Sequence, residues 1–443
     1  MKDVLEKVLN LCDSKFLDGF DAILDTGKSL NISSAKGQVD KYIVSSSQVV
    51  GVRVIKDQKI GISYSEDFSD ESLKTMVNNA MATALASEVD VDQTVIGIVK
   101  DLTDNNPKTY QEDNTDLKEK IELALKLESG ILSKDARAKS TPYNGYGEGE
   151  AHRFYGNSSG LNTYERSKQF SCYTSALMDE GGRQAMFYES STARKFKEMK
   201  VEWVLGECLS KASLLLEAKP LSTGRYDIIF DQDVLKSFLG AYQGVLSGKA
   251  AKDGVSRFKD QVGKIVAHPE FSFSDCPQYK DGFNYSMFDS EGLMKRDVTL
   301  IEKGILKTFY HNTATAKYFG TTTTAHASRS PKGHLGVALE QVVIHPGKSK
   351  EKDLKSGRYL YILGIEGLHA GTNSISGHFS LPAYGLLCED GKTLEPFKGV
   401  TISGNYFDLI KDIAGIGDQV HPDNDHTFFA PVIRFPNISV AGA

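Results

Sequence analysis

The chain has 443 residues, 40% of them hydrophobic and 25% charged, which is ordinary for a globular protein of two or three domains. The formal net charge of −6 argues against a nucleic-acid partner, because nucleic-acid-binding proteins normally carry a basic face. The five cysteines are scattered and never spaced Cys-x-x-Cys, which favours free thiols over a disulfide framework or a zinc knuckle.

The N-terminus mixes charged and apolar residues and has no signal-peptide core. No window approaches the ~20 apolar residues of a membrane span. We therefore expect a cytoplasmic protein that has no membrane partner.

The first elements along the chain are a helix, three strands and a second helix. Residues 4–12 have helical spacing, and strand-like runs follow at 21–25, 48–55 and 59–64, the last two joined by a hairpin turn. Ser69 is a candidate N-cap for a helix that continues to residue 84.

The same order then recurs after a linker rich in Asp, Asn and Thr at 101–116. The predicted elements are a helix at 116–132, strands at 136–149, 150–157, 160–178 and 184–189, and a helix at 201–218. Residues 1–219 are therefore predicted to form an α+β domain with an internal duplication.

The boundary is placed at Lys219, and residues 220–443 have a different character. A strand at 225–230 precedes Asp231, a candidate N-cap, and a helix at 234–246 with one apolar stripe. Short apolar runs separated by glycines and turns then dominate. They predict a mostly antiparallel β domain, either a sandwich or a distorted barrel.

Several segments of this second domain together resemble one known family. They are the helix at 234–246, Lys252–Phe258, Phe288–Gly292, Thr313–Ala316, Thr321–Arg329 and Gly367–Ser380. The last of these matches the pattern G-x-x-A-G-x-N-x-x-(S/T)-G-x-F-S. The chain is similar to the TldD/PmbA family, described as modulators of DNA gyrase and as two-subunit metallopeptidases.

The resemblance implies that this chain is the PmbA (TldE-type) subunit. In the metal-binding TldD-type subunit, the corresponding helix carries a His-Glu-x-x-x-His motif, and Leu239, Gly240 and Gly244 stand at the three motif positions here. A cysteine ligand of the metal-binding subunits also has no counterpart near the C-terminus. The resemblance therefore implies no catalytic residue and no cofactor on this chain, and zinc on a TldD-like partner.

Two segments supply candidate substrate-binding residues. Thr324, His326 and Arg329 belong to a segment that the family places near its substrate groove. The small hydroxyl residues there leave backbone groups approachable for an added strand, and Arg329 could hold either a peptide carboxylate or a structural aspartate. Asn373 and His378 lie in the Gly-rich family segment and are expected to face the substrate channel; the alternative is a structurally demanding loop.

A weak metal candidate remains in His421-Pro422-Asp423-Asn424-Asp425-His426. Both histidines can bind divalent cations. However, Pro and Asn favour a loop, and a solvated turn accounts for the composition.

Three hypotheses follow for function. The first is a non-catalytic subunit that completes a closed dimer with a TldD-like partner and helps to admit unfolded or precursor peptides. The second is a hydrolase that uses another site, around His326, His378 and His421. The third is a peptide-binding or regulatory homodimer without peptidase activity, such as a protein acting on a topoisomerase.

Overall fold

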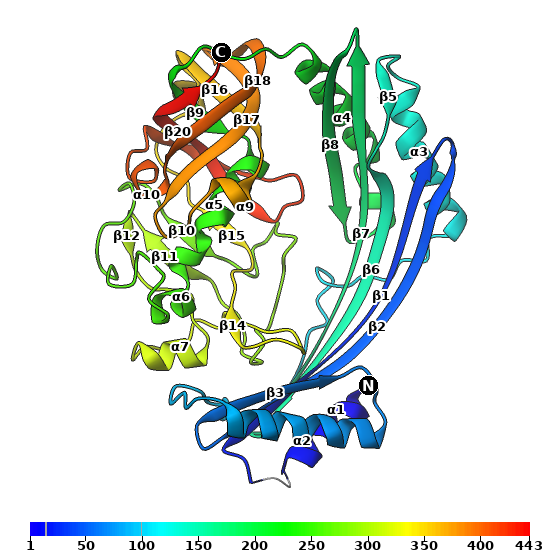
Figure 1. Cartoon of the computed structure of the whole chain (residues 1–443), viewed down its shortest axis with the longest axis vertical. Coiled ribbons are helices and arrows are strands. Elements are labelled where there is room, and N and C mark those ends of the chain that lie inside the picture. Colours follow the sequence, from blue (N-terminus) through cyan, green and yellow to red (C-terminus); the bar gives the residue numbers. More distant parts are fainter. Residues whose placement is uncertain (14–15, 99) are drawn as a thin grey trace.

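The structure, a computed structural model, describes residues 1–13, 16–98 and 100–443. The N-terminal half forms a long curved sheet with helices at its two ends (Figure 1), and the C-terminal half is a second, β-rich unit beside that sheet. The predicted α+β class is confirmed.

The elements of the N-terminal half follow the predicted order. They are α1 (Lys2–Asp13), β1 (Gly19–Ala35), β2 (Gln38–Lys56), β3 (Lys59–Ser65), α2 (Asp70–Ala86), β4 (Lys100–Thr103), α3 (Leu117–Leu132), β5 (Ala138–Ser140), β6 (Asn144–Asn157), β7 (Leu161–Glu180), β8 (Arg183–Ala193), the 3-10 turn η1 (Phe196–Glu198) and α4 (Val201–Leu216).

Local signals set the helix starts correctly. Ser69 caps α2 and Asp116 caps α3, each accepting a hydrogen bond from a backbone N–H of the first turn. Two features differ from the sequence prediction. The strands β1 and β2 are much longer than the apolar runs that predicted them, because their outer parts are polar. The predicted linker begins with β4, which adds to β7 in parallel.

The two predicted rounds join into a single sheet of eight strands with the order β3-β2-β1-β6-β7-β4, and β5 and β8 also pair with β7. The central contact between the rounds is the antiparallel pair β1–β6. The repeated order of elements is present, whereas a duplication of the sequence and the boundary at residue 220 stay predictions.

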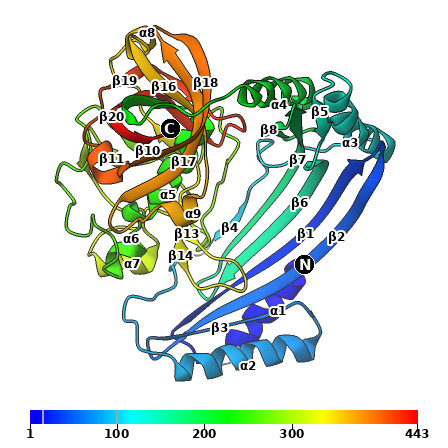
Figure 2. The ribbon, with the colours of Figure 1, turned by 45° about the horizontal axis from the view of Figure 1, so that its top comes forward.

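Alternation along the strands gives the sheet two unlike faces. On one face, α1 and α2 cover the apolar residues of β1 and β2 at one end, while α3 and α4 cover the other end. Figure 2 shows the two helix pairs at the opposite ends of the long strands. The other face, which we call the inner face, carries Asp21, Asp25 and Gly27 of β1 and lies toward the C-terminal half.

The C-terminal half begins with the predicted strand and helix. Its elements are β9 (Gly224–Phe230), α5 (Gln232–Tyr242), the 3-10 turn η2 (Gln243–Leu246), α6 (Gly248–Lys252), β10 (Phe273–Asp275), β11 (Val298–Glu302), β12 (Ile305–Leu306), α7 (Thr313–Tyr318), β13 (Ala327–Ser328), β14 (Gly336–Val337), β15 (Val342–Ile344), α8 (Glu351–Leu354), β16 (Arg358–Ile365), α9 (Leu368–Gly371), β17 (His378–Glu389), β18 (Lys392–Asn405), α10 (Tyr406–Leu409), β19 (Gly415–Pro422) and β20 (Phe428–Ala441).

Five of these strands close a ring, so the barrel alternative of the prediction is the observed one. The order is β9-β16-β17-β18-β20, and β20 pairs back onto β9. Helix α5 belongs to the same core as the barrel strands: the Phe238 side chain is fully buried and its ring packs against Phe230 and Phe379. A branch of β15, β10, β11 and β12 extends from β20.

The two halves touch closely at the α1–α2 end of the sheet. A Cβ placed on Gly51 of β2 would lie 1.8 Å from the carbonyl oxygen of Pro331. Only glycine therefore allows this loop of the C-terminal half to approach the strand so closely.

Candidate functional site

The helix that the family resemblance aligns with the metal motif of TldD-type subunits has no metal-binding side chain at the three aligned positions. Leu239 is buried in the barrel core, and Gly240 and Gly244 have no side chain to offer. A Cβ built on either glycine would meet no other atom within 4 Å. The donor set expected for zinc is therefore not met at Leu239, Gly240 and Gly244, and we derive no catalytic step through a metal here.

The predicted substrate segment around Thr324 is buried in intramolecular contacts. The Thr324 hydroxyl accepts a hydrogen bond from the backbone N–H of His311 at 2.6 Å. Nε2 of His326 lies 3.0 Å from Oδ2 of Asp275, and its Nδ1 lies 2.8 Å from the Thr324 carbonyl oxygen. Their roles in substrate binding stay predictions; in this structure the two side chains tie together loops of the C-terminal half.

Of the two partners considered for Arg329, the structure provides the structural aspartate. The Arg329 side chain is fully buried and donates from Nη2 to Asp21 of β1. Its Nε and Nη1 have no hydrogen-bond partner among the residues that the structure describes. Arg329 therefore joins the C-terminal half to the inner face of the sheet.

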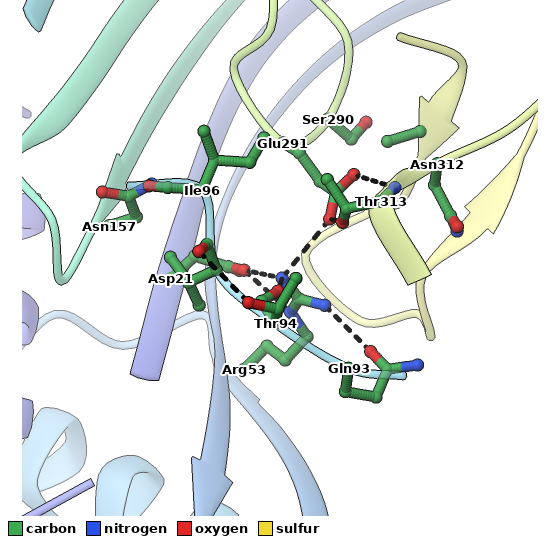
Figure 3. Close-up of polar contacts among 12 residues, drawn as sticks. Asp21, Arg53, Gln93, Thr94, Ile96, Asn157, Ser290, Glu291, Asn312 and Thr313 are labelled. Carbon is green, nitrogen blue, oxygen red and sulfur yellow. Dashed lines mark hydrogen bonds and ion pairs between the residues drawn. The ribbon is translucent and has the colours of Figure 1, made fainter. Parts of the chain in front are cut away.

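Asp21 is the centre of a buried ionic network (Figure 3). It accepts from Arg53 of β2, with Nε at 2.7 Å, as well as from Arg329. Nη2 of Arg53 also lies 3.8 Å from Glu291, which in turn accepts from the Thr313 backbone N–H at 2.9 Å. Two cations and two carboxylates from both halves are thus paired out of contact with water.

Burial and neighbouring charges shift the pKa values of this network in opposite directions. Burial lowers the pKa of the Arg53 guanidinium, but Asp21 and Glu291 together raise it more, so the pKa lies above its usual value. For Arg329 burial prevails over Asp21, and its pKa is lowered. Burial also raises the pKa of the neighbouring carboxyls Glu291 and Asp289, the latter to about 7.

The Gly-rich family segment forms a turn at the start of β17. The Asn373 side chain accepts hydrogen bonds from the backbone N–H groups of Ile375 and Ser376, at 3.0 and 2.9 Å. His378 is exposed and lines a groove of about 490 Å³ together with Asn405 and Asp408. Asn373 therefore shapes the turn in this structure, while His378 is open to a ligand; neither role in substrate binding is tested.

Of the weak metal candidates, His421 lies in β19 and His426 in the turn between β19 and β20. His421 Nε2 contacts Glu351, while the His426 ring packs edge-on against Phe429. Across residues 1–13, 16–98 and 100–443, no group of three or more His, Cys, Asp and Glu side chains could hold a metal ion. The described residues also include no helix long and apolar enough to span a membrane.

A cavity of about 450 Å³ that the sequence did not predict lies between the inner face of the sheet and the segment 283–286. Its floor contains a row of small residues that are cross-strand neighbours on β2, β1, β6 and β7: Ser47, Gly27, Ala151 and Ser167. A second cavity of about 260 Å³ adjoins it and shares all four. Small residues leave room above the strands, and this is what opens the space.

The next row of this face carries charge: Asp25, Arg153 and Glu165 are cross-strand neighbours. Arg153 binds Asp25 through two hydrogen bonds, at 2.8 and 2.7 Å. Burial raises the pKa of the Glu165 carboxyl to about 7, against the attraction of Arg153 and Lys295. Arg194, over the Phe283 ring at 3.9 Å from its centre, forms part of the wall.

Sequence reasoning missed both the network and the cavity. The one local signal was Arg53, a lone cation in the apolar run Val50–Ile55, since a buried charge of this kind requires a partner. Glu165 stands in a polar, alternating strand that gives no such signal.

Comparisons with known proteins identify the fold and the family. The chain shares its fold with a putative modulator of DNA gyrase from Thermotoga maritima MSB8, with a TM-score of 0.87 and 23% identity over 99% of this chain and 100% of that one. It also shares the fold of TldE from Thermococcus kodakarensis, with a TM-score of 0.80 and 20% identity over 99% and 100%.

Family models match three parts of the chain: PmbA/TldA metallopeptidase domain 1 at residues 20–84, the central domain at 110–216 and the C-terminal domain at 223–442. Metalloprotease PmbA of Escherichia coli O157:H7 is 23% identical over 452 residues, covering 100% of this chain and 96% of the relative. The chain therefore belongs to the PmbA/TldD metallopeptidase family, as a PmbA/TldE-type member.

Proposed function

We propose that this chain is the non-catalytic partner of a TldD-like, metal-binding subunit in a peptidase that acts on unfolded or precursor peptides in the cytoplasm. The observation that carries the proposal is the side-chain chemistry of α5 and η2. At the positions where the metal-binding type has two ligands and a general base, this chain has Leu239, Gly240 and Gly244.

In such a complex the partner supplies the zinc, which polarises a carbonyl and activates water. The residues of this chain have other tasks: to enclose the space in which the peptide lies and to hold that peptide extended. The inner face of the sheet suits both tasks, because its cavity of about 450 Å³ is lined by both halves of the molecule and the smaller cavity continues along the strands. A narrow interior also restricts entry to unfolded chains.

The outer part of β2 is a candidate surface for pairing with a second subunit. Within the described part of the chain, β3 pairs with residues 50–56 of β2, so residues 38–49 form a free edge in which Tyr42, Ile43 and Val44 are exposed. A long free edge with apolar side chains tends to pair with another chain. An antiparallel two-fold pair centred on Ile43 would place the two copies of this residue opposite each other.

The same edge favours a second candidate function, a peptide-binding or regulatory homodimer without peptidase activity. The two candidates differ in whether cleavage appears when the partner is added. The hydrolase hypothesis based on His326, His378 and His421 has less support, because His326 is buried against Asp275 and His421 contacts Glu351.

The test uses the purified full chain, a TldD-like homologue from the same organism, and the two proteins together. Cleavage of an unstructured peptide, followed by mass spectrometry, is expected only with both chains and is expected to stop with a chelator. Stoichiometric zinc on this chain alone, with chelator-sensitive cleavage, would refute the proposal. If no cleavage occurs either with this chain alone or after the TldD-like chain is added, the result favours the homodimer.

The pairing surface is tested with Ile43→Lys and Ile43→Asp. In a two-fold homodimer, each variant would place two like charges opposite each other, so each variant alone is expected to sediment as a monomer. An equal mixture of the Lys and Asp variants places opposite charges across the interface and is expected to form dimers again. The control is Leu394→Lys, since Leu394 is also an exposed apolar residue on a strand. If only the complex with the TldD-like chain is weakened by Ile43→Lys, the edge serves the heterodimer.

A further inference from the structure

Among the charged side chains of the cavity, Glu165 differs from the others because they already contact partners within the protein. The structure shows no hydrogen bond or ion pair between Glu165 and any residue within 1–13, 16–98 or 100–443. In contrast, Arg153 binds Asp25 bidentately and Lys295 binds Glu340. Glu165 is partly buried, and a carboxyl that loses water without gaining a hydrogen bond is costly, so a function is a better explanation than stability.

The cations around the cavity are not free to bind an anion. Arg194 donates to the carbonyl oxygens of Thr109, Lys168 and Phe283, at 3.3, 3.0 and 2.7 Å. Arg166, which follows Glu165 in β7 and is also on the lining, stacks on Tyr110 with its guanidinium carbon 3.9 Å from the ring centre.

His152, also on the lining, is held between Tyr164 and Glu150. The uncommitted charge that faces the cavity is therefore negative. A metal ion is a poor occupant for this site, because one carboxylate is too few ligands.

We propose that this cavity binds a primary ammonium group of an unfolded peptide, with the Glu165 carboxylate accepting its hydrogen bonds. That the ligand is a peptide rests on the proposed function. The ammonium comes either from a lysine side chain or from a free N-terminus, since the two share one chemistry.

The floor of the cavity fits a long, flexible side chain. Gly27, Ala151 and Ser167 leave open space beside Glu165, and the adjoining cavity continues along the same strands. The methylene stem of a lysine can lie over this floor while its charged end reaches the carboxylate. A glutamate at this position thus gives the complex a preference for cationic positions in its substrates.

The experiment measures binding of three labelled, unstructured peptides of equal length to the full chain by fluorescence anisotropy. One peptide is N-acetylated and lysine-free, one is N-acetylated with a single lysine, and one is lysine-free with a free N-terminus. At pH 8 the lysine peptide is expected to bind about tenfold more tightly than the neutral one, as for a charge-assisted hydrogen bond. A gain for the third peptide alone would assign the site to the N-terminus.

Glu165→Gln should bring the cationic peptides to the affinity of the neutral peptide and leave the latter unchanged. Glu165→Asp should keep part of the preference. The matched control is Glu395→Gln, which replaces an exposed strand glutamate of β18 and should behave as wild type. Equal affinities of all three peptides for the wild-type chain, no measurable binding of the cationic ones, or a preference that survives in Glu165→Gln would each overturn the proposal.

A pH series adds a second readout. The groups that face Glu165 are Arg153 from β6, Lys295 and Glu340 from the C-terminal half, and Asp104 after β4. Because burial raises the pKa of Glu165 to about 7, the preference for the lysine peptide should fall as the pH decreases from 8 to 6. Any pH dependence that arises from His152 would persist in Glu165→Gln, whereas that of Glu165 would vanish.

The outcome separates this site from the proposed function. Cleavage that requires both chains, together with a peptide preference independent of Glu165, would remove only the ammonium site. A Glu165-dependent preference without partner-dependent cleavage would leave the site in place and favour the peptide-binding homodimer.

Discussion

Replacing Asp21 by asparagine should destabilise the protein strongly, because this carboxylate is shared by two buried guanidinium groups. Its side chain is 1% exposed and accepts from both Arg53 and Arg329. In Asp21→Asn, Arg53 retains Glu291 at 3.8 Å as its carboxylate, together with hydrogen bonds to Gln93 and the Thr94 carbonyl, and Arg329 retains no carboxylate among its ion pairs.

Breaking a buried ion pair by removing one partner costs about 3–5 kcal/mol. Asparagine still accepts one hydrogen bond, so we expect the free energy of unfolding to fall by about 3 kcal/mol or more.

The assay is equilibrium urea unfolding of the full chain, in which the midpoint and the slope are compared with wild type. Asp40→Asn is the control, since Asp40 is an exposed aspartate on β2. That variant should change the free energy of unfolding by no more than about 0.5 kcal/mol.

The variant Arg329→Met breaks the same ion pair from the other side, and its free energy of unfolding can be compared with that of Asp21→Asn. Arg329 has two buried donor atoms without a partner, so its removal relieves a cost as well as breaking an ion pair. Asp21 meanwhile keeps Arg53. Arg329→Met should therefore be less destabilising than Asp21→Asn. Two results would contradict the role of this network in joining the two halves. One is a decrease in the free energy of unfolding of less than about 1 kcal/mol for Asp21→Asn. The other is a larger decrease for Arg329→Met than for Asp21→Asn.

Three further predictions concern the C-terminal half. Phe238→Ala, in the core shared by α5 and the barrel, should lower the free energy of unfolding by about 3–5 kcal/mol in urea titration, because it leaves a cavity; a loss near that of an exposed site would contradict the packing. Asp423→Ala removes the acceptor of the Thr427 and Phe428 backbone N–H groups and should cost about 1–3 kcal/mol, seen as a lower melting temperature. Burial and the nearby Asp231 raise the pKa of Asp233 to about 7 from 3.8, so the protonated form favours the fold. Stability contributed by that proton is present below pH 3.8 and lost as the pH rises through 7. Wild type should therefore lose stability relative to Asp233→Asn between pH 4 and 8, and a constant difference would show that Asp233 does not titrate in this range.

The local sequence was sufficient to predict most of the helices. Ser69 and Asp231 cap helices as predicted, and Asp116 caps the helix that was predicted to begin there, because capping depends on a few adjacent residues. The apolar stripe of α5 predicted its burial, and the identity of Leu239, Gly240 and Gly244 excludes metal ligands at those positions without reference to any contact.

The lengths of the strands were less accessible to sequence reasoning. Residues 38–48 of β2 are exposed and mostly polar, so they show no alternation of apolar and polar residues. They form a strand because β1 supplies backbone partners along their whole length, and this pairing is a tertiary property.

The sequence by itself determined the α+β class and the starts of several helices, since both depend on residue type and short-range spacing. Only the tertiary structure decided that the barrel closes through the β9–β20 pair, that Arg329 binds Asp21, and that Glu165 faces a cavity without a partner. Asp21 and Arg329 are 308 positions apart. Their pairing, like the position of Glu165 on the cavity, follows from how the two halves of the chain pack against each other, and no local pattern encodes it.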